Sequence, residues 1–187
     1  DGKLLSKDSH YGFAWISDKD ALAIAYYLKS LKPVSNKVDR RTSGAVATKN
    51  EEGQGEKTLS DIRGFIPSPV QSVSAEYGRY LAMHVAACSR CHRAEGTWLD
   101  DEIPLGGEAE YERKEFVQED FPIAGPDIRG KLDQNLGNWA LDDFVKYLST
   151  GFASDGRKID GRMCPWPYYR GMTEDDKRAI AILLKKL

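Results

Sequence analysis

Two cysteines and a histidine occur together as Cys88-Ser89-Arg90-Cys91-His92, and this pentapeptide constrains the chain more than any other feature. Two thiols three positions apart can each add to a vinyl group of the same porphyrin, and the histidine that follows then lies under the iron as an axial ligand. The pattern therefore predicts one haem c, attached covalently through Cys88 and Cys91, with His92 as an iron ligand.

Other uses of a C-x-x-C pair fit the chain less well. A thioredoxin-type redox pair is expected near a βαβ pattern, and no strand alternation surrounds this one. A zinc site needs four ligands, whereas the third cysteine, Cys164, stands alone in the sequence and the other histidines are His10 and His84. A chance match in an unrelated helix is the remaining alternative.

Composition indicates a soluble globular protein. The 187 residues are 41% hydrophobic and 30% charged, with a formal net charge of −2. This balance gives no reason to expect nucleic acid or a membrane surface as a partner, and the apolar runs are far shorter than the roughly 20 residues that span a bilayer. Because covalent haem attachment requires export, we expect a mature periplasmic or otherwise extracytoplasmic protein, and no signal peptide opens the chain at Asp1.

The two ends of the chain resemble each other. Residues 16–31 align without gaps on residues 172–187, and both copies begin with a hydroxyl residue, Ser17 or Thr173, followed three positions later by aspartate. This spacing is typical of a capped helix start. We interpret residues 1–31 as the C-terminal remnant of a first haem unit, residues 32–72 as a linker, and residues 73–187 as the haem domain.

Helical patterns dominate the second part of the chain. Ser74 is the predicted cap of a helix that leads into the cysteine motif, and further helices are expected over 142–148 and 173–187. No segment has a convincing strand pattern. The sequence therefore predicts an all-α fold whose small core gains apolar surface from the bound haem.

Residues 73–187 resemble a class I cytochrome c domain, of the kind found in bacterial di-haem cytochromes c and in cytochrome subunits of dehydrogenases. Four elements carry the resemblance in the expected order: residues 77–92, Gly125-Pro126-Asp127-Ile128-Arg129-Gly130, residues 138–151 and residues 155–176. The resemblance implies the class I helical fold around a covalently bound haem.

The resemblance also implies roles for individual residues around the haem. The Pro126 carbonyl is expected to accept a hydrogen bond from Nδ1–H of His92, which fixes the ring and makes it a better donor to iron. Ile128 is expected to pack against the haem or in the core. Trp139 and Trp166 each carry one indole N–H that can reach a haem propionate, and simple core packing is an equal alternative for both.

The distal iron ligand is ambiguous because the chain departs from the family pattern by one extra residue. Counting forward from Asp155-Gly156-Arg157 places Met163 at the expected position, whereas counting back from Met172 places Cys164 there. The sequence favours the neutral thioether of Met163, which stabilises Fe(II). A Cys164 thiolate would instead favour Fe(III), and Met172 is better explained as the apolar residue before a helix cap.

An acidic segment separates the cysteine motif from Gly125. Residues 100–120 contain nine acidic residues against two basic ones. Such a segment can steer a basic redox partner toward the haem domain, so we expect protein electron donors and acceptors to dock here. A solvated loop without a partner is the alternative interpretation.

These features favour an electron-transport protein over a catalyst. With two protein ligands on iron there is no open position for a substrate, so the expected function is transfer of single electrons between Fe(II) and Fe(III), in a di-haem cytochrome or in the cytochrome subunit of a respiratory redox complex. The alternative is a haem enzyme of the di-haem type, thiosulfate-oxidising or peroxide-reducing, with cysteine or labile distal ligation. Its support is the extra residue at Met163-Cys164.

Overall fold

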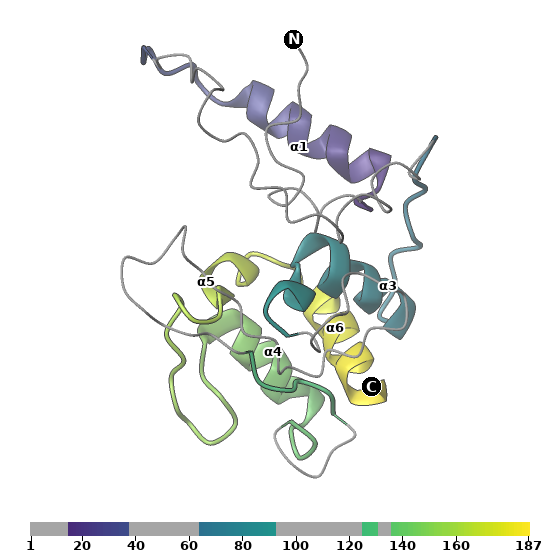
Figure 1. The fold of residues 1–187 in the computed structure, drawn as a ribbon, viewed down its shortest axis with the longest axis vertical. Coiled ribbons are helices and arrows are strands. Elements are labelled where there is room, and N and C mark those ends of the chain that lie inside the picture. The colour runs from purple at the N-terminus through teal and green to yellow at the C-terminus, as the bar shows by residue number, and fades with distance from the viewer. Residues whose placement is uncertain (1–14, 38–63, 93–124, 131–135) are drawn as a thin grey trace, which may run out of the picture. The chain divides into compact units, whose positions relative to one another are not determined.

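The structure, a computed structural model, describes residues 15–37, 64–92, 125–130 and 136–187, and the chain divides into two compact units, residues 1–68 and 69–187. The elements within these described ranges are helices (Figure 1). One isolated antiparallel bridge pairs Phe152 with Lys158, and no sheet is present in these ranges. The predicted predominance of helix is therefore confirmed. The assignment of residues 1–31, 32–72 and 73–187 to a remnant, a linker and a haem domain stays a prediction.

The first unit contains the helix α1, Asp18–Ser30. Ser17 caps it as predicted, because its hydroxyl accepts a hydrogen bond from the backbone N–H of Asp20 at 3.2 Å. Residues 66–68 bind the same end of α1. The Asp18 N–H donates to the Ile66 carbonyl at 3.1 Å, and the Ser68 hydroxyl donates to the Ser17 hydroxyl at 3.1 Å. The start of α1 is thus fixed by both local and distant contacts.

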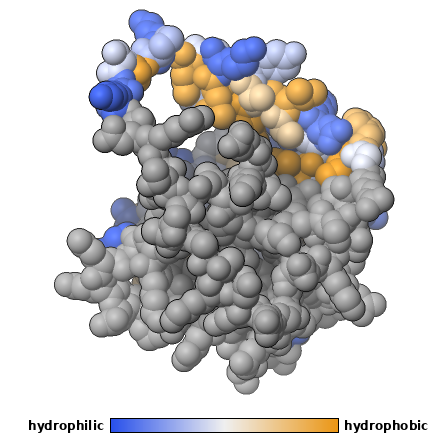
Figure 2. All heavy atoms as spheres, turned by 45° about the horizontal axis from the view of Figure 1, so that its top comes forward, coloured by the Kyte–Doolittle hydropathy of each residue, from blue (hydrophilic) through white to orange (hydrophobic). Residues whose placement is uncertain are grey.

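None of the residues of α1 is buried. Ile24 is 50% exposed and Leu28 is 59% exposed, and the apolar side chains of this unit gather into a visible patch (Figure 2). A helix whose apolar residues recur at helical spacing normally buries them against a neighbour. In α1 these side chains are left uncovered.

The second unit is built from helices that meet around one core. Its elements are α3 (Ala75–Tyr80), a π-helical turn (Leu81–Val85), a 3₁₀ turn (Cys88–Arg90), α4 (Leu141–Thr150), α5 (Trp166–Tyr169) and α6 (Glu174–Lys186). Both α3 and α4 pack against α6 (Figure 1). The buried core consists of Tyr77, Leu81, Ala82, Met83, Phe144, Leu148, Ala179, Ile180, Ala181, Leu183 and Leu184.

The sequence explains where α6 begins. Thr173 and Asp176 form a capping box, in which the Asp176 N–H donates to the threonine hydroxyl at 3.1 Å and the Thr173 N–H donates to the aspartate at 3.2 Å. Acidic residues occupy the first turn and lysines the last, as the helix dipole favours. The predicted helix and its cap are confirmed.

Lys177 is a buried cation on α6, 6% exposed. Its ammonium group donates to the Ser149 hydroxyl at 2.9 Å and to the Arg170 carbonyl at 3.0 Å. A buried ammonium must be hydrogen-bonded to be tolerated, and these two acceptors lie at the end of α4 and after α5. Lys177 therefore joins α6 to both neighbouring segments.

Gly78 is the point of closest approach between α3 and α6. A Cβ added at this glycine would overlap the carbonyl oxygen of Ala179 and lie 3.1 Å from the backbone nitrogen of Ile180. Both neighbours belong to the backbone of α6, so neither can move aside without shifting the helix. Only a glycine allows the two helices to meet at this distance.

We expect Gly78→Ala to lower the free energy of unfolding by about 2 kcal/mol, because forced separation of packed elements outweighs the gain in helix propensity. Urea unfolding of the haem-loaded protein, followed by circular dichroism, measures the change. Gly171→Ala is the matched control, since a Cβ there meets nothing within 4 Å. Equal stability of the two variants would mean that α3 and α6 do not need this close approach.

Candidate haem-attachment site

The chain reaches the cysteine motif through an irregular helix. After α3 the backbone widens into the π-helical turn Leu81–Val85, and Ala87 then adopts a left-handed conformation with φ +52°. Both features are uncommon for ordinary residues and cluster at functional sites. They turn the chain so that a new 3₁₀ turn starts at Cys88.

That turn brings the three motif side chains together. The backbone N–H groups of Cys91 and His92 both donate to the Cys88 carbonyl, at 3.2 and 3.0 Å. The two thiols and the imidazole therefore belong to a single tight turn. This arrangement matches what attachment of one porphyrin through two thioethers requires.

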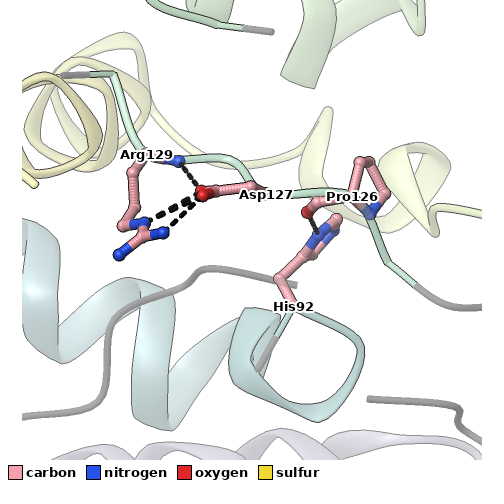
Figure 3. A network of polar contacts seen from close by, with 4 residues as sticks. All are labelled: His92, Pro126, Asp127 and Arg129. Atoms are coloured by element: carbon pink, nitrogen blue, oxygen red, sulfur yellow. Dashed lines mark hydrogen bonds and ion pairs between the residues drawn. The ribbon is translucent and has the colours of Figure 1, made fainter. Parts of the chain in front are cut away.

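His92 is held by the hydrogen bond that the resemblance implied. Its Nδ1 lies 2.7 Å from the carbonyl oxygen of Pro126 (Figure 3). A carbonyl accepts only from the protonated nitrogen, so this contact assigns the proton to Nδ1 and leaves Nε2 as the nitrogen that can bind a metal. Burial lowers the pKa of His92, although the hydrogen bond to Pro126 and the charge of Asp127 act in the opposite sense. Burial thus favours the neutral, metal-binding form.

Gly125 lets the proline segment approach the motif. Its N–H donates to the Cys91 carbonyl at 3.1 Å, and an added Cβ would overlap that same oxygen and lie 2.9 Å from Nδ1 of His92. At the other end of the segment the Gly130 N–H donates to the Leu184 carbonyl of α6 at 2.7 Å. The segment 125–130 is therefore anchored to the attachment turn at one end and to the core at the other.

Asp127 and Arg129 stiffen the segment between these anchors. The guanidinium of Arg129 contacts the Asp127 carboxylate at 2.6 Å, and the Arg129 backbone N–H donates to the same group at 2.8 Å (Figure 3). Burial alone would raise the pKa of Asp127, but the hydrogen bonds and charge of Arg129 lower it below its usual value. The carboxylate therefore stays ionised on the residue that directly follows the carbonyl orienting His92.

The motif thiols are partly buried and lie near another thiol and two phenol groups. Burial, and after it the neighbouring Cys164 and Cys91, together raise the pKa of the Cys88 thiol to about 12. Burial also raises the pKa of Tyr147, whose hydroxyl is hydrogen-bonded to Cys164. The structure therefore brings Cys164 close to the haem-attachment thiols.

A second tyrosine lies near the same thiols. The Tyr169 hydroxyl donates to the Ala86 carbonyl at 2.9 Å, and its pKa is raised by burial and then by the three cysteines. Sequence reasoning missed both tyrosines. Tyr147 could have been found, since it lies three positions after Phe144 on a predicted amphipathic helix, whereas Tyr169 gives no comparable local signal.

Met163 and Cys164 differ in exposure. The backbone N–H groups of both residues donate to the Asp160 carbonyl, at 3.0 and 3.2 Å, but Met163 is 50% exposed while Cys164 is half-buried. Met172 is partly buried against the core, as expected of a residue before a helix cap. Which of Met163 and Cys164 binds iron stays a prediction.

The remaining predicted haem contacts lie at the edge of the core. The indole N–H of Trp166 donates to the Ile159 carbonyl at 2.9 Å. The Trp139 ring packs on Phe144, with ring centroids 5.2 Å apart, and Ile128 is partly buried against the same core. A propionate contact from either tryptophan stays a prediction.

The donor set around the attachment turn fits haem c. Two thiols share one turn with an imidazole whose Nδ1 is already held, and a glycine leaves room for the supporting carbonyl. Across the described ranges no group of three or more His, Cys, Asp and Glu side chains is placed to hold a metal ion without a porphyrin. The acidic segment 100–120, predicted as a docking loop, lies outside the described residues.

Comparison with known proteins gives distant matches. The chain is 27% identical over 188 residues to the cytochrome c subunit of a quinone-dependent alcohol dehydrogenase of Gluconobacter oxydans, covering 94% of this chain and 37% of that subunit. It is 26% identical over 199 residues to the corresponding subunit of Gluconacetobacter polyoxogenes, covering 100% of this chain and 41% of the relative. It is 24% identical over 194 residues to the gluconate 2-dehydrogenase cytochrome c subunit of Pantoea cypripedii, covering 94% of this chain and 41% of that subunit.

The chain spans about two fifths of the length of these curated relatives, between 37% and 41%. No protein-family model matches it, and no solved structure matches it significantly. The sequence resemblance is nevertheless confirmed at the level of the dehydrogenase subunits: this chain is a distant homologue, over its whole length, of cytochrome c subunits of quinone-dependent alcohol dehydrogenases and of gluconate 2-dehydrogenase.

Proposed function

We propose that this protein transfers single electrons through one haem c, attached to Cys88 and Cys91 and ligated by His92. The observation that carries the proposal is the contact of 2.7 Å between Nδ1 of His92 and the Pro126 carbonyl, because it prepares the imidazole for iron. The relatives, whose names are those of cytochrome c subunits, support electron transfer through haem c.

A bound haem supplies a one-electron couple between Fe(II) and Fe(III). The protein's own residues set the geometry of that couple. The Pro126 carbonyl holds the imidazole of His92 in one tautomer, and Gly125 lets the carbonyl reach it. Core residues of the π-helical turn, including Leu81 and Met83, are buried and keep water from this side of the attachment segment.

On the distal side we propose Met163 as the second iron ligand. The class I pattern supports it, and a neutral thioether avoids the cost of burying a charged ligand. Met163 is half-exposed, so this role requires its side chain to turn inward when haem is bound. Cys164 is the second candidate, because it already borders the attachment thiols.

The proposed setting is a cytochrome subunit of an extracytoplasmic dehydrogenase complex, with protein donors and acceptors as partners. The names of the relatives support this setting. None of the described helices is long and apolar enough to cross a membrane. The acidic segment 100–120 is the proposed docking site for a basic redox partner, which would make electron exchange slower at high salt.

The test is a haem assay combined with redox titration of the purified protein. We expect one haem per chain that resists extraction by acidified acetone, and a reversible one-electron couple in an optical titration. Absence of covalent haem would overturn the proposal. Turnover of peroxide or thiosulfate at the haem would instead favour the alternative of a haem enzyme with a Cys164 or labile distal ligand.

We further propose that α1 is the last helix of a first cytochrome-like unit. The alignment pairs Ile24 with Ile180 and Leu28 with Leu184, which are 2% and 6% exposed in α6, the helix that packs against α3 and α4. Their counterparts in α1 are 50% and 59% exposed. The proposal assigns the cover of these side chains to a helix equivalent to α3, with its own haem-attachment motif.

This proposal predicts which α1 side chains matter for stability. We expect Leu28→Asp to lower the free energy of unfolding by roughly 2 kcal/mol, because the charge would be buried under the covering helix. Leu22→Asp is the matched control: it is 58% exposed and aligns with Arg178, so it should have little effect. Thermal unfolding compares the two, and equal tolerance of both substitutions would contradict a covering helix.

A further inference from the structure

One hydrogen bond joins the attachment segment to the loop that carries both candidate distal ligands. The hydroxyl of Tyr169 in α5 donates to the Ala86 carbonyl at 2.9 Å, although the two residues are 83 positions apart. Ala86 lies two residues before Cys88, at the end of the π-helical turn. Carbonyls at a helix end need partners from outside the helix, and Tyr169 supplies this one.

The hydrogen bond from Tyr169 to Ala86 lies next to an unusual backbone conformation. Ala87 is left-handed, with φ +52°, so the chain leaves its helical path directly after Ala86 and turns toward the motif. An alanine in this conformation is held by its surroundings rather than by its own preference. The Tyr169 hydroxyl donates its hydrogen bond to the backbone at this bend.

We define the distal loop as residues 161–172, which contain Met163, Cys164 and α5. Other contacts hold this loop to itself and to the neighbouring helices: Trp166 donates to the Ile159 carbonyl at 2.9 Å, and Lys177 donates to the Arg170 carbonyl at 3.0 Å. Those contacts set the shape of the loop. The Tyr169 bond sets its position relative to the cysteine turn.

We propose that Tyr169 is a positioning residue that holds the distal loop against the haem-attachment segment, so that the sulfur ligand from this loop stays on the iron. The inference rests on the proposed function, since it requires an attached haem c with a ligand from residues 161–172. Tyr169 itself touches Ala86 and the core, and it acts through the loop.

The physical consequence concerns the balance between ligand-on and ligand-off states. Removing the hydroxyl leaves the Ala86 carbonyl without this donor and weakens the attachment of the loop, while a phenylalanine ring still fills the same space in the core. The ligand-off state becomes more populated. An external ligand that binds iron in that state then binds more tightly by the same factor.

Imidazole titration of the oxidised, haem-loaded protein tests the proposal, with binding followed in the visible spectrum. We expect Tyr169→Phe to raise the apparent affinity for imidazole by about 3- to 10-fold, the effect of one lost hydrogen bond. Tyr168→Phe is the matched control, because the neighbouring side chain is 84% exposed. The control should bind imidazole as the unsubstituted protein does.

Thermal unfolding of the same samples separates positioning from general stability. A Tyr169→Phe variant that unfolds at a lower temperature but binds imidazole with unchanged affinity would overturn the proposal, because the tyrosine would then only stabilise the fold. Failure of the unsubstituted protein to carry covalent haem would overturn the proposed function instead. Covalent haem with equal imidazole affinity in both tyrosine variants would overturn this inference alone.

Discussion

A variant with serine in place of both Cys88 and Cys91 is expected to retain no covalently bound haem. A hydroxyl does not form the thioether with a porphyrin vinyl group, and both anchoring sulfurs lie on the single turn that begins at Cys88. Mass spectrometry of the protein, with absorbance after extraction by acidified acetone, measures the loss. The expected effect is all or none, the largest of any substitution in the chain.

Cys164→Ser is the control for this experiment. Cys164 borders the attachment thiols but lies outside the 88–92 motif, so its loss should leave the covalent haem in place. The single variants Cys88→Ser and Cys91→Ser should each keep one thioether. Covalent haem in the double variant would show that Cys164 can act as an anchor, which would contradict the assignment of the site.

Loss of the haem should also expose how much of the fold depends on it. Cys88 and Tyr169 are partly buried next to the core. Ala87, which directly precedes Cys88, has a left-handed backbone conformation. A small core depends strongly on any group that binds the folded state alone. We therefore expect the double variant to unfold at lower urea concentration than the Cys164→Ser control.

The sequence was sufficient to predict features whose determinants are local. The start of α6 follows from Thr173 and Asp176, and the start of α1 from Ser17, because a capping side chain and its backbone partner are only three residues apart. The contact between His92 and Pro126 is not local, but the motif resemblance implied it. The family pattern supplied the long-range information that composition and periodicity lack.

Features set by tertiary contacts could not be predicted. Residues 81–87 have ordinary helical preferences, and nothing in them signals a π-helical turn or a left-handed alanine. The burial of Lys177 could not be predicted either, because lysine side chains are usually solvated. Here the fold places two acceptors, the Ser149 hydroxyl and the Arg170 carbonyl, beside its ammonium group. The Tyr169 contact spans 83 residues and leaves no local pattern.

The different surroundings of Met163 and Cys164 are also among the features that the sequence could not predict. Counting residues from either side could not decide between them, because one extra residue in the loop shifts the register. In the structure it is Cys164 that faces the attachment thiols, while Met163 is half-exposed. Position favours the cysteine, whereas the cost of burying a thiolate favours the methionine.

Substitution of the distal ligand should therefore have the second-largest effect in the protein. We expect Met163→Ala to abolish the weak near-infrared band that arises from sulfur-to-iron charge transfer, and to lower the reduction potential by tenths of a volt, within the roughly 0.8 V range that axial ligands control. Optical spectra of the oxidised protein and a redox titration measure both changes. Cys164→Ala, the neighbouring substitution, should leave the band and the potential nearly unchanged.

The opposite pattern has an equally definite meaning. If Cys164→Ala alters the spectrum and raises the potential while Met163→Ala leaves both unchanged, a thiolate is bound to the iron and Met163 keeps its exposed position. A thiolate stabilises Fe(III) and pushes electron density onto the iron, so the protein would suit chemistry at a low potential better than simple electron transfer. The alternative of a haem enzyme would then replace the electron carrier as the proposed function, while the attachment turn and the His92–Pro126 contact would keep the roles assigned to them.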